Sequence, residues 1–152
     1  MQVWRLASGA YPPLTGEGAR LADGRWHSGG RRVVYTSESL ALATLECLVH
    51  LPVRLPAGYV AFRIEVPEGE IESLAPGLLS PGWQQHRVET REIGNEWLDQ
   101  QRSLALLVPS VVVPHGSNCL INPAHPAAER LRVLEQRPHR WDPRLRPPEP
   151  PA

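Results

Sequence analysis

The sequence predicts one α+β domain with a split, largely antiparallel sheet and a few helices. Three observations lead to this class. The chain has 152 residues, close to the length of a single domain. Segments with strand character outnumber those with helix character, and the two kinds do not alternate regularly as they do in parallel α/β sheets. Hydrophobic residues make up 41% of the chain, which is enough for one core.

The first half of the chain predicts three strands around one helix. Strands are expected at residues 3–7, 31–37 and 58–67, where apolar residues alternate or form short β-branched runs. Residues 40–51 are apolar nearly all round, which predicts a buried helix that ends at Pro52. Ser37 or Ser39 can cap it. Residues 11–30 are rich in glycine and proline without periodicity, and such long loops are often functional.

The second half predicts a further mixture of elements. They are an amphipathic helix at 88–103, two short strands or one bent edge strand at 104–114, a strand at 118–123, a helix at 125–136 and a last strand at 140–146. The tail, residues 147–152, is proline-rich and is expected to be disordered, which leaves residues 1–146 as the domain.

Composition excludes several classes of function. The formal net charge is zero, so nothing predicts direct binding of nucleic acid. All 16 basic residues are arginine, which excludes a lysine nucleophile and makes every cation a planar fork for phosphate or carboxylate. No secretory leader is visible, and no apolar run approaches the roughly 20 residues that span a bilayer. Cys47 and Cys119 are interpreted as buried free thiols, so we expect a cytoplasmic protein.

Three residues between positions 21 and 51 are candidates for chemistry. Arg25 lies in a glycine-flanked loop, which lets the backbone approach an anion. Tyr35 ends a strand, and Glu46 lies in a helix where an ionised carboxylate is costly unless it is paired or faces a cleft. Each also has a plain structural interpretation: a surface arginine, a core tyrosine, and a glutamate on a wet helix face that it shares with His50.

Other patterns are weaker. Ser110 interrupts an apolar run, but no G-x-S-x-G surrounds it, so it is not a hydrolase nucleophile by motif. Arg5 places one charge in a predicted strand, either at an edge or aimed into a cleft. Cys47 and His50 form one C-x-x-H with no second pair at zinc spacing, so no metal site is expected. The stretch GEGARLADG, residues 16–24, matches neither a dinucleotide fingerprint nor a P-loop.

Taken in order, several motifs resemble the RES domain family, which is named for an Arg, a Glu and a Ser. They are WRL, G-x-G-A-R-x-x-x-G-R-W-H-S-G, VVYTSES-x-A-x-A-x-x-E, LVPSVVV, N-x-L-I-N-P-x-H-P and WDPRL. The resemblance covers about residues 2–146. It implies a fold like the ADP-ribosyltransferase catalytic domains of the diphtheria-toxin type.

The resemblance also implies a function. Family members are toxins of bacterial type II toxin–antitoxin pairs, and they consume NAD by hydrolysis, by phosphorolysis or by transfer of ADP-ribose to a protein. The expected partner is an Xre-type helix-turn-helix antitoxin in a hetero-oligomeric complex. The residues that match the family's catalytic positions are Arg25, Tyr35, Glu46 and Ser110. Those expected to bind NAD are Arg5, Arg25, Tyr35, Asn118 and Asn122. His27 stands where the family often has Asn.

The implied reaction suits these residue types. Cleavage of the nicotinamide–ribose bond passes through an oxocarbenium-like state, which a carboxylate such as Glu46 can stabilise. The Tyr35 ring can hold nicotinamide, and Arg25 and Arg5 offer forks to the pyrophosphate. Ser110 could donate a hydrogen bond to the carboxamide or the ribose. No metal is required, and loops 11–30 and 76–88 could cover the cleft.

Two other functions fit the sequence less well. A metal-independent ribonuclease toxin could also use Arg, His, Tyr and Glu, but the chain has zero net charge and no basic stripe. A binding module without catalysis could present the same polar cleft to a partner. Incubation of the protein with NAD and with RNA separates these functions.

Overall fold

The computed structural model describes residues 1–146, in which a seven-stranded sheet is covered by short helices. The strands are β1 (Gln2–Ser8), β2 (Val34–Ser37), β3 (Tyr59–Glu65), β4 (Ile71–Ser73), β5 (Ala105–Pro109), β6 (Ser117–Ile121) and β7 (Arg132–Pro138). The α-helices are α1 (Glu17–Arg20), α2 (Leu40–Leu48) and α3 (Arg87–Gln100). The predicted tail, residues 147–152, lies outside the described residues.

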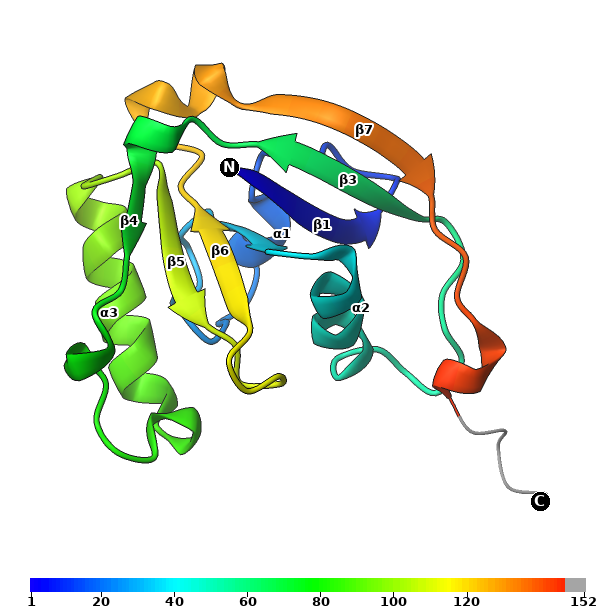
Figure 1. Ribbon diagram of the computed structural model, residues 1–152, viewed down its shortest axis with the longest axis horizontal. Helices are drawn as coiled ribbons and strands as arrows, with labels where there is room; N and C mark the ends of the chain where they lie inside the picture. Colours follow the sequence, from blue (N-terminus) through cyan, green and yellow to red (C-terminus); the bar gives the residue numbers. More distant parts are fainter. Residues whose placement is uncertain (147–152) are drawn as a thin grey trace.

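The sheet is split between β2, its central strand, and the neighbouring β1. The strand order is β4-β5-β6-β2-β1-β3-β7, and all neighbours are antiparallel except β4 and β5. β1 and β2 share one register pair, Trp4 with Ser37, whereas β1 and β3 stay paired over seven. Strands β4 to β6 therefore diverge from β1, β3 and β7 (Figure 1). This confirms the predicted fold class.

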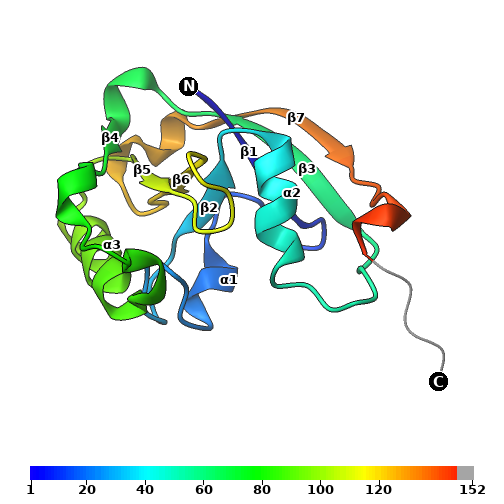
Figure 2. The same ribbon diagram turned by 60° about the horizontal axis from the view of Figure 1, so that its bottom comes forward.

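Helix α2 lies beside this split (Figure 2). The Ser39 hydroxyl accepts a hydrogen bond from the Leu42 N–H, as an N-cap should. Ala43 packs with Leu6 of β1 and Ala61 of β3 in a small apolar cluster. The outer face differs from the prediction of a helix buried all round, because Leu45 is 40% exposed. The apolar pattern of this helix therefore includes a face that the described chain leaves open.

Helix α3 packs against strands β5 and β6. Its Trp97 and Leu98 are buried with Leu106 of β5 and Leu120 of β6, and the Trp97 indole N–H donates to the Ser103 hydroxyl. A separate cluster that includes Val3, Phe62, Ile64, Ala105 and Ile121 forms the main core. The predicted helix at 88–103 is thus confirmed.

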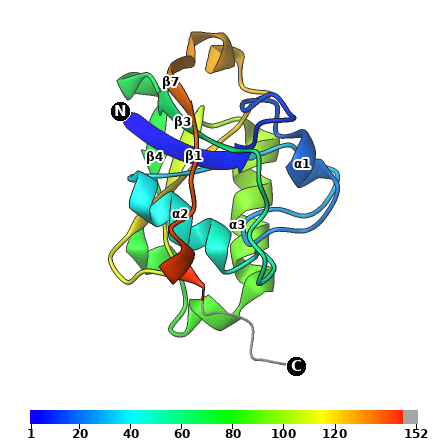
Figure 3. The ribbon, with the colours of Figure 1, turned by 90° about the vertical axis from the view of Figure 1, so that its right-hand side faces the viewer.

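The C-terminal part of the described chain was predicted wrongly. Residues 125–136 do not form a helix: Pro126–Arg130 is a 3-10 turn, and β7 follows it and pairs with β3. The helix-forming residues there are overridden because the open edge of β3 offers backbone hydrogen bonds. Residues 140–146 contain a 3-10 turn, Pro143–Leu145, in place of a strand. Its neighbour Arg146 donates to backbone carbonyls at the end of α2, and Figure 3 shows this segment beside that helix.

The apolar run 104–114 also differs from its prediction. It holds one strand, β5, which lies between β4 and β6 and not at an edge, and the chain then turns. The short parallel strand β4, which the sequence analysis missed, covers the side of β5 that would otherwise be open. Among residues 1–146, no helix is long and apolar enough to cross a membrane.

The loop that carries Arg25 packs closely against α3 at Gly94. A Cβ at position 94 would overlap the Trp26 carbonyl oxygen and lie 2.7 Å from the carbonyl carbon. We therefore expect Gly94→Ala to lower the free energy of unfolding by about 2 kcal/mol or more, measured by urea denaturation. Gly18→Ala is the control, because a Cβ there meets nothing within 4 Å, and we expect a change of less than about 1 kcal/mol. Equal effects of both substitutions would contradict this account.

Candidate active site

A cavity of about 980 Å³ lies where β1 and β2 separate. Its walls come from β1, β2, α2, β6, the loop around Arg25 and the start of α3. Cavities of a few hundred to about 1,000 Å³ are typical of sites for small molecules. Five of the predicted site residues line it, and they are Arg5, Arg25, Tyr35, Glu46 and Asn118. Ser110 and Asn122 do not.

The carboxylate of Glu46 is held from two directions. Its Oε1 accepts a 2.6 Å hydrogen bond from the Ser110 hydroxyl and another of 2.6 Å from the Asn118 side-chain amide. Within residues 1–146, the second oxygen, Oε2, accepts no hydrogen bond from the protein. Because one oxygen is fixed by two donors, the carboxylate has a defined orientation and keeps an oxygen for a ligand.

The two donors are themselves held in place. The Ser37 hydroxyl donates to Asn118 Oδ1 at 2.7 Å, which leaves the Asn118 amide nitrogen to face Glu46. The Ser110 hydroxyl oxygen accepts from the Val112 and Val113 N–H groups, at 3.1 and 3.0 Å. Its single proton is therefore committed to Glu46. The structure places Ser110 behind the carboxylate, whereas the sequence predicted a direct contact with the nicotinamide or the ribose.

The Tyr35 hydroxyl forms a hydrogen bond with a buried histidine, His27. His27 Nε2 lies 2.6 Å from the Ala19 carbonyl and 3.0 Å from the Ala22 carbonyl, so this nitrogen carries the proton. Its Nδ1 is then an acceptor and receives the Tyr35 hydroxyl at 2.7 Å, while the Trp26 N–H donates to the same phenol oxygen. Burial raises the pKa of Tyr35 to about 12. Tyr35 is thus neutral at physiological pH, and its ring is what it offers to the cavity.

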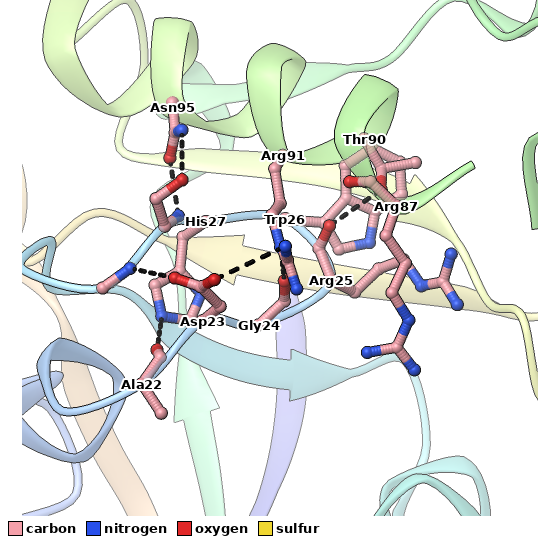
Figure 4. Close-up of polar contacts among 12 residues, drawn as sticks. Ala22, Asp23, Gly24, Arg25, Trp26, His27, Arg87, Thr90, Arg91 and Asn95 are labelled. Carbon is pink, nitrogen blue, oxygen red and sulfur yellow. Dashed lines mark hydrogen bonds and ion pairs between the residues drawn. The ribbon is translucent and has the colours of Figure 1, made fainter. Parts of the chain in front are cut away.

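Arg25 stands in a loop fastened to α3 (Figure 4). The Thr90 hydroxyl donates to the Arg25 carbonyl at 2.8 Å, and Arg91 Nε donates to the Gly24 carbonyl at 2.8 Å. One terminal nitrogen of the Arg25 guanidinium donates to the Gln84 carbonyl. Burial and the neighbouring charge of Arg87 lower the pKa of Arg25, and the charge of Glu46 opposes this. The Arg25 guanidinium and the Glu46 carboxylate both line the cavity, and the carboxylate charge favours the charged form of Arg25.

Arg5 crosses the split in the sheet. Its guanidinium donates to the Tyr35 carbonyl at 3.2 Å, and its Nε is buried without a partner in the described part of the chain. Burial lowers the pKa of Arg5. It therefore joins β1 to β2 and at the same time adds positive charge to the cavity wall.

Asn122 belongs to the scaffold. Its amide donates to the Leu98 carbonyl at 3.1 Å, its Oδ1 accepts from the Ala124 N–H, and its side chain is buried away from the cavity. His50 does line the cavity, one turn after Glu46. Among residues 1–146, no group of three or more His, Cys, Asp or Glu side chains is placed to hold a metal ion.

Two residues of the site went unrecognised in the sequence. His27 was assigned no role in the chemistry, although it holds the Tyr35 hydroxyl. Arg87 lines the cavity, but it is separated from Arg25 by more than 60 residues and lies in the loop 76–88, for which only a role in covering the cleft was predicted. An aromatic residue beside an apolar run gives no sign of its hydroxyl's partner, and an arginine at the start of a helix gives no sign of what it faces.

Comparison with known sequences identifies the family. The family described as RES domain matches residues 2–142. The chain belongs to the RES domain family. The Prs ADP-ribosylating toxin of Sphingobium sp. (strain YBL2) is 40% identical, over 93% of this chain and 94% of that protein. Toxin Res of Pseudomonas putida (strain KT2440) is 40% identical over 88% of this chain and 92% of its own length.

Comparison with solved structures supports the same fold for this RES domain. It superposes with a TM-score of 0.70 on a chain from the crystal structure of the M. tuberculosis MbcT-MbcA toxin-antitoxin complex. The match covers 95% of this chain and 85% of that chain at 16% sequence identity. At this identity the likeness concerns the fold.

The Tyr35 hydroxyl can be tested apart from its ring. Tyr35→Phe would leave the His27 Nδ1 and the Trp26 N–H without their partner, so we expect the free energy of unfolding to fall by about 1–3 kcal/mol. Tyr59→Phe is the control, because the Tyr59 hydroxyl makes no hydrogen bond within residues 1–146. Denaturant titration measures both, and an unchanged Tyr35→Phe protein would show that the hydroxyl is not held as described.

Alkaline pH should destabilise this RES domain. Burial raises the pKa of Cys47 and of Cys119 from 9.0 to about 11, and that of Tyr35 from 10.0 to about 12. The folded chain therefore retains protons that the unfolded chain releases, so stability is full below pH 9 and is lost as the pH rises through 11 to 12. Melting temperatures between pH 8 and 11 measure this, and Cys119→Ala should show a shallower fall. An identical slope in that variant would contradict the assignment.

Proposed function

We propose that this protein is the toxin of a bacterial type II toxin–antitoxin pair and that it consumes NAD by cleaving the nicotinamide–ribose bond. The observation that carries the proposal is Glu46, a carboxylate held at one oxygen by Ser110 and Asn118 and open at the other, in a cavity shared with Tyr35 and Arg25. Membership of the RES family and a 40% identical relative named as an ADP-ribosylating toxin support it.

Glu46 stabilises the positive charge that develops on the ribose. As the bond from C1′ to the nicotinamide nitrogen breaks, its electron pair goes to nicotinamide, which leaves as a neutral base, and the ribose becomes oxocarbenium-like. A fixed carboxylate stabilises that state without having to reorganise. The free Oε2 is the atom that faces the ribose, because Oε1 is already shared by two donors.

The remaining side chains bind and orient the dinucleotide. The Tyr35 ring packs against nicotinamide, since its hydroxyl is turned to His27 and its pKa of about 12 excludes it as a base at neutral pH. Arg25 pairs with the pyrophosphate, and Arg5 adds positive charge from the floor of the cavity. Ser110 and Asn118 are positioning residues that act through Glu46. NAD is the substrate, and no metal enters these steps.

The proposed partner is an Xre-type antitoxin that neutralises the toxin in a hetero-oligomeric complex. Apolar side chains at and near the cavity support a protein partner: Leu45, Val49 and Val111 are 40%, 56% and 37% exposed, and Val49 and Val111 also line the cavity. Exposed apolar side chains that gather at one place are typical of protein-binding surfaces. The cytoplasmic location stays a prediction.

The alternatives have less support. A ribonuclease requires a basic track for the phosphate backbone, and the formal net charge of the chain is zero. A binding module without catalysis gives no reason for the two 2.6 Å hydrogen bonds on one Glu46 oxygen. Incubation of the purified protein with NAD and with RNA distinguishes the three: depletion of NAD with intact RNA is the expected result.

Glu46→Gln is the sharpest single test of the proposed activity. It keeps the shape of the side chain and removes its charge, so we expect the rate of NAD consumption to fall by about 100-fold or more with an unchanged melting temperature. Glu92→Gln is the control, since Glu92 carries the same charge on α3 and does not line the cavity. Arg25→Ala should also lose the activity. Full NAD turnover by Glu46→Gln would contradict the proposal.

The acceptor of the ADP-ribosyl group is identified by its product. Incubation with NAD, with and without inorganic phosphate, followed by mass spectrometry yields free ADP-ribose if water attacks. It yields a phosphorylated ADP-ribose if phosphate attacks. A protein that gains the mass of ADP-ribose shows transfer to a side chain.

A further inference from the structure

The starting observation is an arginine in the cavity wall that the proposed mechanism does not use. Arg87 is the first residue of α3, it is exposed, and it lines the cavity together with Arg25. Within residues 1–146, its guanidinium makes neither a hydrogen bond nor an ion pair. The nearby Arg91 differs, because it donates to the Gly24 carbonyl and pairs with Asp23 at 3.4 Å.

Arg87 and Arg25 bring two positive charges to the same end of the cavity. Both side chains line the cavity, and Figure 4 shows them extending to the same side of the Arg25 loop. Like charges at short range repel each other, and this repulsion is relieved when an anion lies between them. A phosphate or diphosphate group accepts hydrogen bonds from two guanidinium forks at once.

Within residues 1–146, no carboxylate pairs with Arg25 or Arg87. Two carboxylates of this part of the chain line the cavity, Glu46 and Asp23. Glu46 is held by Ser110 and Asn118, and Asp23 accepts from the Gly29 N–H and pairs with Arg91. Among the described residues 1–146, only the Gln84 carbonyl accepts a hydrogen bond from the Arg25 guanidinium, which has five N–H groups. This end of the cavity is therefore a pair of guanidinium groups with open donors.

We propose that Arg87 and Arg25 form a two-arginine clamp for the diphosphate of the dinucleotide, with Arg87 as a substrate-binding residue from α3. The inference rests on the proposed function, because it assigns the diphosphate to the Arg25 end and the nicotinamide ribose to Tyr35 and Glu46. The clamp should therefore bind ligands that carry the diphosphate. Nicotinamide riboside lacks the diphosphate, so its binding should not depend on the clamp.

The test compares ligands with and without the diphosphate in a protein that is expected to consume NAD at least about 100-fold more slowly. Glu46→Gln is the parent, and Arg87→Gln and Arg130→Gln are each added to it. Arg130 is the matched control because it also loses one charge but pairs with Glu70 away from the cavity. Calorimetry measures the affinity for NAD, ADP-ribose and nicotinamide riboside.

We expect Arg87→Gln to weaken the affinity for NAD and for ADP-ribose by about 10-fold or more. The affinity for nicotinamide riboside should stay unchanged. Arg130→Gln should leave all three affinities unchanged. Arg87→Lys should restore part of the loss, since it returns the charge without the fork. The affinity of the parent for NAD should also fall more steeply with increasing salt concentration than the affinity of Arg87→Gln does. The reason is that the variant presents one positive charge fewer to the ligand.

Two results would overturn the clamp while leaving the function intact. One is an Arg87→Gln protein that binds NAD as tightly as the parent does. The other is an Arg87→Gln protein whose affinity for nicotinamide riboside falls as much as its affinity for NAD. A parent protein that binds none of the three ligands would instead overturn the proposed function, and the clamp with it.

Discussion

The loss of pairing between β1 and β2 is the constraint on which the rest of the molecule depends. A sheet that continued across these strands would close the space in which the cavity lies, yet they share a single register pair, Trp4 with Ser37. The hydrogen bonds missing between the strands are partly replaced by Arg5, which donates to the Tyr35 carbonyl. Helix α2 then brings Glu46 to the opening. The same break in the sheet thus creates the cavity and lets three elements converge on it.

Much of this arrangement could be predicted because it follows from local pattern. Short apolar strands without regular alternation with helices predicted the fold class, and the order of the motifs predicted that Arg25, Tyr35, Glu46 and Asn118 belong to one site, where all four line the cavity. Residues 125–136 could not be predicted locally. Their side chains favour a helix, but in the fold they pair with the open edge of β3. That edge belongs to a strand about 70 residues earlier in the chain, so no local pattern reveals it.

The roles of individual side chains were harder to predict than their presence. Ser110 was recognised as a site residue, but a sequence cannot show that two backbone N–H groups occupy its oxygen and turn its proton toward Glu46. Asn122 fits the motif as well as Asn118 does. The two differ only in direction, since Asn118 points across β2 and β6 into the cavity and Asn122 into the scaffold beside α3.

Asn118 has one more consequence, for a chain still emerging from the ribosome. The site needs Arg5 from the first strand and Asn118 from the sixth, so most of the polypeptide must be made before Glu46 has both of its donors. Synthesis runs from the N-terminus, and contacts between distant segments form late. A nascent chain therefore carries Arg25, Tyr35 and Glu46 before it carries the residue that fixes the carboxylate. The order of translation itself therefore delays the completion of the site until most of the chain has been made.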